Sequence, residues 1–365
     1  RKTCELNAAL GDGGRGSTGG RVRQRAREVL VVGQLALALT LLVTSGLMVR
    51  SYFELRSVDP GCDPRGVVAM SLPIAGAEYP EPAGALALYQ DVVERVRALP
   101  GVERAGVTSG LPVEDSGTLL GHSFEDAPLD PDEIAPNYKT HLVLPGALDV
   151  LSIPLLAGRR FDSSDLREDV RTVLISESLA RSVWPNPANA VGRRVMPARP
   201  QEGGVWYTIV GVVGDAPYGG LARGMKEALY YPFWSLRVGT EDRLYDRQLE
   251  LVIKTSLPPA SVVRAAADVV WSIDADIPVA DIRTLEEVVA QAGLRTRFTM
   301  VLLLVAAGVA IVLGAVGLYG AISYVVSLRT REIGIRIALG ADPGEVSRMV
   351  LGRGLALAVV GLVIG

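Results

Sequence analysis

The sequence predicts an α+β membrane protein in which transmembrane helices flank a large extracytoplasmic domain. Val29 to Val49 is a run of 21 residues without a charge, and Thr299 to Leu328 is a second run of 30. A helix rises about 1.5 Å per residue, so roughly 20 residues cross a hydrocarbon core of about 30 Å. Both runs can therefore span a membrane, and the longer one should tilt or project from it.

The distribution of charge predicts the orientation of the two runs. Residues 1–50 carry a net charge of +5, residues 51–298 carry −10, and residues 299–365 carry +2. Basic flanks are expected on the cytoplasmic side, so residues 50–298 should face outside. Their acidic character argues against nucleic-acid binding. The first run is too long for a typical signal peptide, and Leu47 to Arg50 offers no small-residue cleavage site.

The apolar runs divide the chain into six predicted segments. A cytoplasmic linker (1–28) leads into a transmembrane helix (29–49) and an extracytoplasmic domain (50–298). A transmembrane or stalk helix (299–328), a cytoplasmic segment (329–347) and the start of a further transmembrane helix (348–365) follow. The last apolar run, Leu355 to Gly365, contains too few residues to span a membrane. The sequence is therefore expected to be a fragment of a longer membrane protein.

Hydrophobic periodicity within the outer domain indicates two strand–helix–strand units. The first unit covers strand 66–74, helix 85–99 and strand 102–110, and the second covers strand 249–256, helix 259–273 and strand 277–285. Two such units predict a split β-α-β, ferredoxin-like subdomain over about 62–114 and 246–283. Residues 115–245 are too many for a loop, so they predict an inserted mixed α/β subdomain.

Local patterns inside the insertion predict further short elements. The expected strands are 139–144, 172–175, 206–213 and 228–231, and the expected helices are 146–151 and 177–184. After the second unit, Thr284 and Glu287 have the spacing of a capping box that begins a helix. The first apolar helix should also continue past Arg50. Each end of the outer domain would then join a span through a stalk helix that can transmit motion.

A search for catalytic or cofactor chemistry identifies no site. Gly11 to Thr18 resembles a phosphate-binding loop, but Ser17 stands where that motif needs lysine. His122 and His141 fall in different predicted segments, which makes a metal site improbable. Cys4 and Cys62 lie on opposite sides of the membrane in the predicted topology, so they cannot pair. We therefore predict a protein that is not an enzyme and has no cofactor of its own.

The apolar runs also lack the ionisable residues that ion-coupled carriers place at depth. Small residues in the second run instead predict close helix packing, at Gly308, Gly314, Gly317 and Gly320. Beyond that run, Arg329 to Ala341 reads RTREIGIRIALGA and predicts a short amphipathic helix between two spans. This helix would either rest on lipid headgroups or dock a cytoplasmic protein. Asp342 to Glu345 has the pattern of a new helix start.

Several motifs together closely resemble the FtsX-like permease family of ABC transporters. Besides RTREIGIRIALGA, they are SIPLLAGRRFDSSD, VLISESLARSVWP, AVGRRV and WYTIVGVVGDAPYGGL, which resemble the periplasmic core domain of MacB-type permeases. The combination looks most like the ADOP group of acidobacterial permeases, and the Gly-rich start suggests its C-terminal permease half. The resemblance implies a bacterial inner-membrane location and a porter-like subdomain carrying an insertion.

The same resemblance implies a mechanism and partners. Such permeases pair with a separate cytoplasmic P-loop ATPase, which binds the ATP, and they act as homodimers or intrachain pseudo-dimers, with a periplasmic adaptor or envelope protein as a further partner. The segment against the ATPase would be Arg331, Glu332, Ile333, Gly334, Arg336, Ala338, Leu339 and Gly340. A membrane-anchored sensor or scaffold without an ATPase is the alternative. The sequence does not choose a substrate or a direction of transport.

Overall fold

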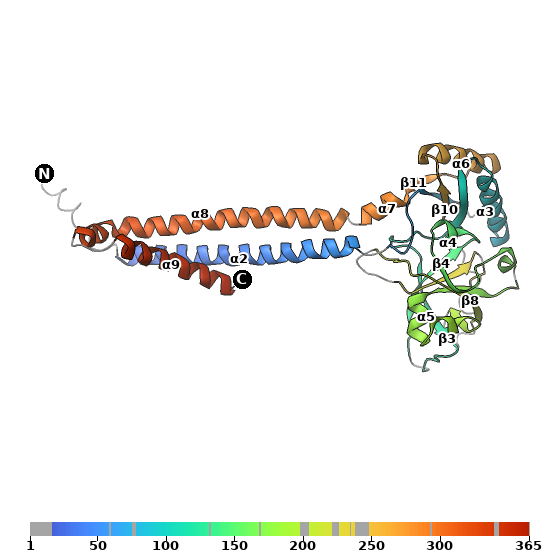
Figure 1. Cartoon of the computed structure of the whole chain (residues 1–365), viewed down its shortest axis with the longest axis horizontal. Coiled ribbons are helices and arrows are strands. Elements are labelled where there is room, and N and C mark those ends of the chain that lie inside the picture. The colour runs from blue at the N-terminus through green and yellow to red at the C-terminus, as the bar shows by residue number, and fades with distance from the viewer. Residues whose placement is uncertain are drawn as a thin grey trace. The chain divides into compact units, whose positions relative to one another are not determined.

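The computed structural model of the chain describes residues 17–57, 60–74, 78–130, 133–167, 169–197, 204–220, 226–233, 235–237, 248–292, 294–338 and 343–364. These residues belong to two compact units (Figure 1). The helical unit combines the chain up to Glu54 with the chain from Arg295 onward, and the outer unit is Leu55–Leu294. Each unit is described below by itself.

Three long helices make up the described part of the helical unit. They are α2 (Ser17–Ser57), α8 (Leu294–Ala338) and α9 (Pro343–Ile364). Most of their large apolar side chains are exposed, as lipid-facing positions require. Among the described residues, two helical stretches, Val29–Glu54 and Leu285–Tyr324, are long and apolar enough to cross a membrane. Helix α2 begins 12 residues before the predicted span and, as expected, continues past Arg50.

The outer unit contains a mixed sheet with helices on its faces. Its helices are α3 (Pro82–Arg97), α4 (Ala147–Val150), α5 (Glu177–Val183), α6 (Pro259–Ile273), α7 (Leu285–Ala292) and the short 3-10 turns η2 (Ser163–Leu166) and η3 (Pro187–Ala190). Its strands are β1 (Val67–Pro73), β2 (Val102–Thr108), β3 (Thr118–Phe124), β4 (Asn137–Val143), β5 (Leu155–Gly158), β6 (Thr172–Ser176), β7 (Arg194–Pro197), β8 (Tyr207–Val213), β9 (Ala228–Pro232), β10 (Gln248–Thr255) and β11 (Ala280–Thr284).

The two predicted strand–helix–strand units are present and their strands interleave. The order across this part of the sheet is β11-β1-β10-β2, and all three neighbouring pairs are antiparallel. Helix α3 begins at Pro82, and α6 begins at Pro259 in the same way. Figure 1 shows the two helices beside these strands. Proline at N1 therefore marks both helix starts, three residues earlier than expected for α3.

Side chains that alternate along β1 divide the core between the two faces of the sheet. Met70 and Leu72 belong to a buried cluster with residues of α3 and α6. Val67 and Ala69 belong to a second cluster, which includes Leu285 and other buried residues of α4 and α7. A strand directs successive side chains to opposite faces, so β1 is buried on both sides.

The inserted residues extend the same sheet and close part of it on itself. Strand β4 joins β2 through one residue pair, Thr108 with Val143. From β4 the pairing runs through β3, β7, β8, β6 and β9, and β9 pairs in parallel with β4 again. Six described strands thus form a closed ring, and the ring is closed by the pairing of β4 with β9, which are far apart in the sequence.

Three strands of the outer unit were not anticipated by the sequence analysis. They are β3, β5 and β7. Strands β5 and β7 each contain four residues, and β7 ends at Pro197, so neither displays a full period of alternation. Gly121 interrupts β3 where a Cβ would lie only 3.1 Å from the Cβ of Ala135. The other strands and helices predicted in the insertion are confirmed, with ends shifted by one or two residues.

Candidate functional site

Glycines bring the three helices of the helical unit together. A Cβ at Gly317 of α8 would lie 2.6 Å from Oε1 of Gln34 on α2, and one at Gly314 would lie 3.4 Å from Cδ2 of Leu35. On α9, a Cβ at Gly361 would lie 2.8 Å from Cβ of Leu35. Leu35 therefore contacts glycines of both partner helices, an arrangement that membrane helices use for close approach.

Only part of the predicted glycine surface is used in this way. Within the described chain, positions where a Cβ would stand at Gly308 and Gly320 have no heavy atom within 4 Å. The prediction is therefore confirmed for Gly314 and Gly317 and not for the other two. The expectation of an ordinary packing role for these glycines is met where α8 faces α2.

The predicted coupling segment forms the last turns of α8. Arg331 to Ala338 continue the helix that begins at Leu294, so the separate short helix expected here is wrong. The reason is local, because the sequence places no proline between Leu294 and Asp342. Gly334 is exposed, the side chains of Arg331, Glu332, Ile333, Arg336 and Ala338 lie outside the described part, and Leu339 and Gly340 lie outside it entirely.

Helix α9 begins at Pro343, as the pattern around Asp342 predicts. Thr330, the residue before the predicted coupling residues, donates its hydroxyl to the carbonyl of Val326 at 3.0 Å. Because residues four apart share one face of a helix, Glu332 and Arg336 occupy the same side of α8. The structure thus brings six of the eight predicted coupling residues onto consecutive turns of one helix.

The chain enters and leaves the outer sheet through neighbouring strands. Strand β1 follows α2 in sequence, and β11 directly precedes α7. The two strands are antiparallel, with Val68 opposite Thr284. Thr284 and Glu287 form the predicted capping box: the Thr284 amide donates to Glu287 Oε2 at 2.8 Å, and the Glu287 amide donates to Thr284 Oγ1 at 3.2 Å. Both connections therefore meet at one end of a strand pair.

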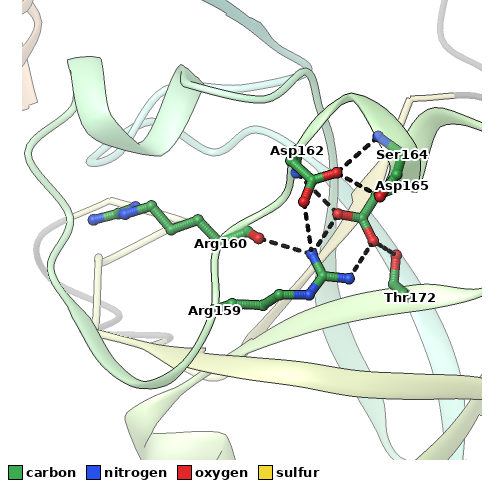
Figure 2. A network of polar contacts seen from close by, with 6 residues as sticks. All are labelled: Arg159, Arg160, Asp162, Ser164, Asp165 and Thr172. Atoms are coloured by element: carbon green, nitrogen blue, oxygen red, sulfur yellow. Dashed lines mark hydrogen bonds and ion pairs between the residues drawn. The ribbon is translucent and has the colours of Figure 1, made fainter.

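A buried carboxylate organises the segment between β5 and β6. Figure 2 shows Arg159 donating to both oxygens of Asp165, at 2.6 and 2.8 Å. Thr172 Oγ1 and the amide of Asp162 add hydrogen bonds to Asp165 at 2.9 Å each. Burial pushes the pKa of Asp165 upward, but these hydrogen bonds outweigh burial and lower it below its ordinary value. The site fixes a turn and has no catalytic geometry.

This network lies in the motif GRRFDSSD, which the sequence analysis used only as a resemblance. Asp162 and Asp165 have the spacing of a capping box, and the structure contains that box at η2. That spacing could have predicted the turn, although the sequence analysis did not use it. The contact with Arg159 carried no such signal, since it depends on how β5 and β6 are placed.

The two histidines lie apart in the outer unit and are both fully buried. His122 contacts the carbonyl of Leu120 at 2.9 Å and the hydroxyl of Tyr231 at 3.1 Å. His141 packs on Tyr218 with ring centroids 3.8 Å apart. Burial lowers the pKa of His122 to about 4 and that of His141 to about 3. Both rings are therefore neutral near pH 7 and act as core side chains.

Comparisons with known proteins find two family matches along the chain. Residues 29–270 match the MacB-like periplasmic core domain, and residues 304–365 match the FtsX-like permease C-terminal family. The chain is 26% identical over 223 residues to the uncharacterized ABC transporter permease YknZ of Bacillus subtilis (strain 168), over 60% of this chain and 53% of that protein. It is 24% identical over 227 residues to the macrolide export ATP-binding/permease protein MacB of Mannheimia succiniciproducens, over 60% and 32% of the two chains.

A solved structure, the periplasmic region of MacB from Actinobacillus actinomycetemcomitans, is similar with a TM-score of 0.41 and 11% identity, over 64% of this chain and 95% of that one. The chain spans about half the length of the YknZ relative and about a third of the MacB relative. The first family match covers more than half of the chain, and the second follows it in order. This chain therefore belongs to the MacB/FtsX-type permeases, with a MacB-like periplasmic core domain followed by an FtsX-like permease region.

Proposed function

We propose that this chain is a permease subunit of a MacB/FtsX-type ABC transporter, which transmits ATP-driven motion from a cytoplasmic ATPase to the outer domain. Membership of the permease family is the observation that carries the proposal. In this proposal ATP is bound and hydrolysed by a partner subunit. The work done outside is efflux, or the handling of a lipoprotein or another envelope substrate.

The way in which the chain enters the outer unit supports transmission of motion. The two connections to membrane-spanning helices leave from paired strands, β1 and β11, and the second continues at once into α7. Leu285 and Val288 of α7 are buried in the core of the outer unit. A displacement of α7 therefore acts directly on packed side chains, because a close-packed core transmits strain.

The coupling surface in this proposal is the end of α8 and the residues that follow it. Arg336 and Glu332 would make charged contacts with the ATPase, and Ile333 and Leu339 would fill an apolar pocket. Arg331, Gly334, Ala338 and Gly340 complete the segment. Support comes from the helical backbone through Ala338, which presents successive turns beyond the apolar part of α8.

Finer assignments belong to the same proposal. The chain would be the C-terminal half of an ADOP-group permease in the bacterial inner membrane, with a pseudo-dimer partner in the same polypeptide or a second copy. The order β11-β1-β10-β2 supports a split β-α-β, porter-like subdomain, and the ring of six strands supports a separate inserted one. A periplasmic adaptor or envelope protein would bind outside.

Affinity purification of the full-length protein from gently solubilised native membranes tests the proposal. We expect a P-loop ATPase to copurify and to be lost when Arg336 and Leu339 are both replaced by alanine. Arg348→Ala and Ile335→Ala are matched controls, because they remove a basic and an apolar side chain from neighbouring positions outside the predicted set. Both controls should retain the ATPase.

Two results would contradict this assignment. If the double variant retained the ATPase and its stimulation, the coupling residues would lie elsewhere. If no ATPase copurified under conditions that preserve a known ABC transporter from the same membranes, the sensor or scaffold alternative would replace the permease function.

A further inference from the structure

Arg283 on β11 binds three carboxylates from different parts of the outer unit. Its Nη1 lies 2.7 Å from Oε1 of Glu114 and 3.0 Å from Oδ2 of Asp281. Its Nη2 lies 3.4 Å from Oε1 of Glu250 on β10. One guanidinium therefore joins β11, β10 and the segment that follows β2, immediately before the Thr284 cap of α7.

An irregularity in β11 places Arg283 in this position. The pairing of β1 with β11 shifts between Ala69 and Ser71, which face Arg283 and Ala280. Strand β11 thus has one extra residue there, and Asp281 has a φ of 49°. A bulge of this kind redirects the following side chains. Aspartate tolerates the left-handed region better than most residues, so its identity suits the bend.

Glu114 connects this group of charges to the inserted residues. Its carbonyl accepts a hydrogen bond from the Gly219 amide at 2.8 Å, and the Val113 amide donates to the carbonyl of Pro217 at 2.6 Å. Val113 has a φ of 73°, which is a strained conformation for a β-branched residue. Backbone hydrogen bonds therefore connect the segment after β2 to the segment after β8. Arg283 binds to these connected segments through Glu114.

Glu250 is the most buried carboxylate of the group, with 9% of its surface exposed. It stands opposite Ser71 on β1 and Thr108 on β2, neither of which is charged. The charged groups that face it are Arg283 and Asp281 from β11 and Glu114 from the segment after β2. Its Oε2 is buried without a hydrogen-bond partner among the described residues.

Charged side chains on the helices that flank these strands have partners of their own. Glu287 of α7 accepts a hydrogen bond from the Thr284 amide, and Glu286 interacts electrostatically with Arg65. Asp149 of α4 pairs with Arg160 at 3.0 Å. The protonation of Glu250 is therefore governed by the group built around Arg283.

We propose that Arg283 is the positioning residue that fastens β11, and with it α7, to the outer sheet. We further propose that this closed arrangement is more stable when the buried Glu250 is protonated, although the ion pair between Glu250 and Arg283 is then lost. Arg283 occupies the centre of the three carboxylates, so the group is built to hold an arginine and not a metal cation. A role of this fastening in the transmission of motion rests on the proposed permease function. The fastening itself is a property of the outer unit.

The direction of the pH effect follows from burial. Burial raises the pKa of Glu250 from 4.5 to about 7, with Arg283 opposing this and Glu114 and Asp281 adding to it. The folded arrangement thus binds a proton more tightly than an opened one. The contribution is fully present below pH 4.5 and is lost as the pH rises through 7. The fastening should be firm in mildly acidic surroundings and weaker in mildly alkaline ones.

Hydrogen exchange of the full chain in lipid nanodiscs tests the proposal without an ATPase. Protection of residues 280–292 is measured at about pH 6 and about pH 8, and corrected for intrinsic exchange; we expect it to be about tenfold lower at the higher pH. Glu250→Gln keeps the shape and removes the titration, so it should abolish this difference. Glu125→Gln is the matched control: it removes a carboxylate from an exposed ion pair with Arg194 and should leave the difference intact.

Arg283 is tested in the same measurement. Arg283→Met should lower protection of residues 280–292 at both pH values, and Arg283→Lys should restore part of it because the charge is kept. Protection unchanged in Arg283→Met, or a pH difference that persists in Glu250→Gln, would overturn the proposal. Copurification of the ATPase with Glu250→Gln is recorded in parallel, so that failure of the fastening is distinguished from failure of the permease function.

Discussion

Arg159 and Asp165 form a two-point ion pair, 2.6 and 2.8 Å long, in which the carboxylate is fully buried and the guanidinium is about half exposed. The pair closes the turn between β5 and β6, and Figure 2 shows how the neighbouring backbone and Thr172 complete it. Every oxygen of Asp165 is satisfied by donors. The Asp165 side chain therefore stabilises this turn only by accepting hydrogen bonds.

Asp165→Asn should destabilise the outer unit by about 2–4 kcal/mol, because an amide group must face the donors that surround the carboxylate. Urea unfolding of the detergent-solubilised chain, followed by tryptophan fluorescence, measures the loss. Asp169→Asn is the control, since it removes a carboxylate from an exposed pair with Arg167 at 3.1 Å. Equal losses in the two variants would contradict the role given to Asp165.

Gly158→Ala should cost about 3 kcal/mol or more, because its Cβ would add overpacking to an unfavourable left-handed backbone. Gly158 has a φ of 76°, and the Cβ would lie 2.2 Å from the carbonyl oxygen of Val210. Gly192 has a φ of 88° but no heavy atom within 4 Å. Gly192→Ala should therefore show only the conformational cost, about 1–2 kcal/mol, in the same unfolding measurement.

Gly317, Gly320 and Gly361 of the helical unit should respond differently to alanine. Replacement gains about 1 kcal/mol of helix propensity at each position. Gly320→Ala meets nothing within 4 Å and should stabilise, whereas Gly317→Ala should be nearly neutral because the flexible Gln34 must move. Gly361→Ala approaches the carbonyl of Val32 at 3.2 Å as well as Leu35, so its melting temperature should fall. A common shift in all three would argue against the observed helix contacts.

His141→Phe should reduce the loss of stability on acidification. The folded pKa of His141, about 3, is below its ordinary value of 6.5, so wild-type stability falls as the pH drops below 6.5. Between about pH 6.5 and pH 5 this histidine contributes a loss of about 2 kcal/mol, which the variant should avoid. Glu250 acts in the opposite direction in this range, so urea midpoints are compared between variants at each pH.

His122→Phe is the comparison for this prediction. Neither ring nitrogen of His141 has a hydrogen-bond partner among the described residues, whereas His122 contacts Leu120 and Tyr231. His122→Phe should therefore lose stability at neutral pH too. If both variants kept the wild-type acid sensitivity, other groups would be responsible for it.

Local patterns predicted the parts of the fold that depend on near neighbours in sequence. The periodicity of α3, the capping box at Thr284 and the proline at Pro343 each identified an element or its start. The same patterns did not predict pairing between strands that are far apart in the sequence. Nothing in β4 indicates that it pairs with β9, and the bulge at Asp281 depends on the register of β1.

The functional residues show the same division. The predicted coupling residues came from a resemblance, because a run such as Arg331 to Gly340 has no chemistry that identifies it alone. Arg283 is far in sequence from Glu114 and Glu250, and only the folded sheet brings them together. Arg159 and Asp165 lie in one short turn, but the spacing of this pair is not one that identifies an ion pair. Their spacing in sequence carries no periodic signal.

The pairing of Val68 with Thr284 has a mechanical consequence. The two connections leave this antiparallel strand pair at the same end. When they are pulled apart, the hydrogen bonds between the strands break one after another, starting from that end. A closed ring of strands has no such free end, so it cannot be opened one pair at a time in the same way. The outer unit therefore combines one compliant corner, between β1 and β11, with a stiff body formed by β4, β3, β7, β8, β6 and β9.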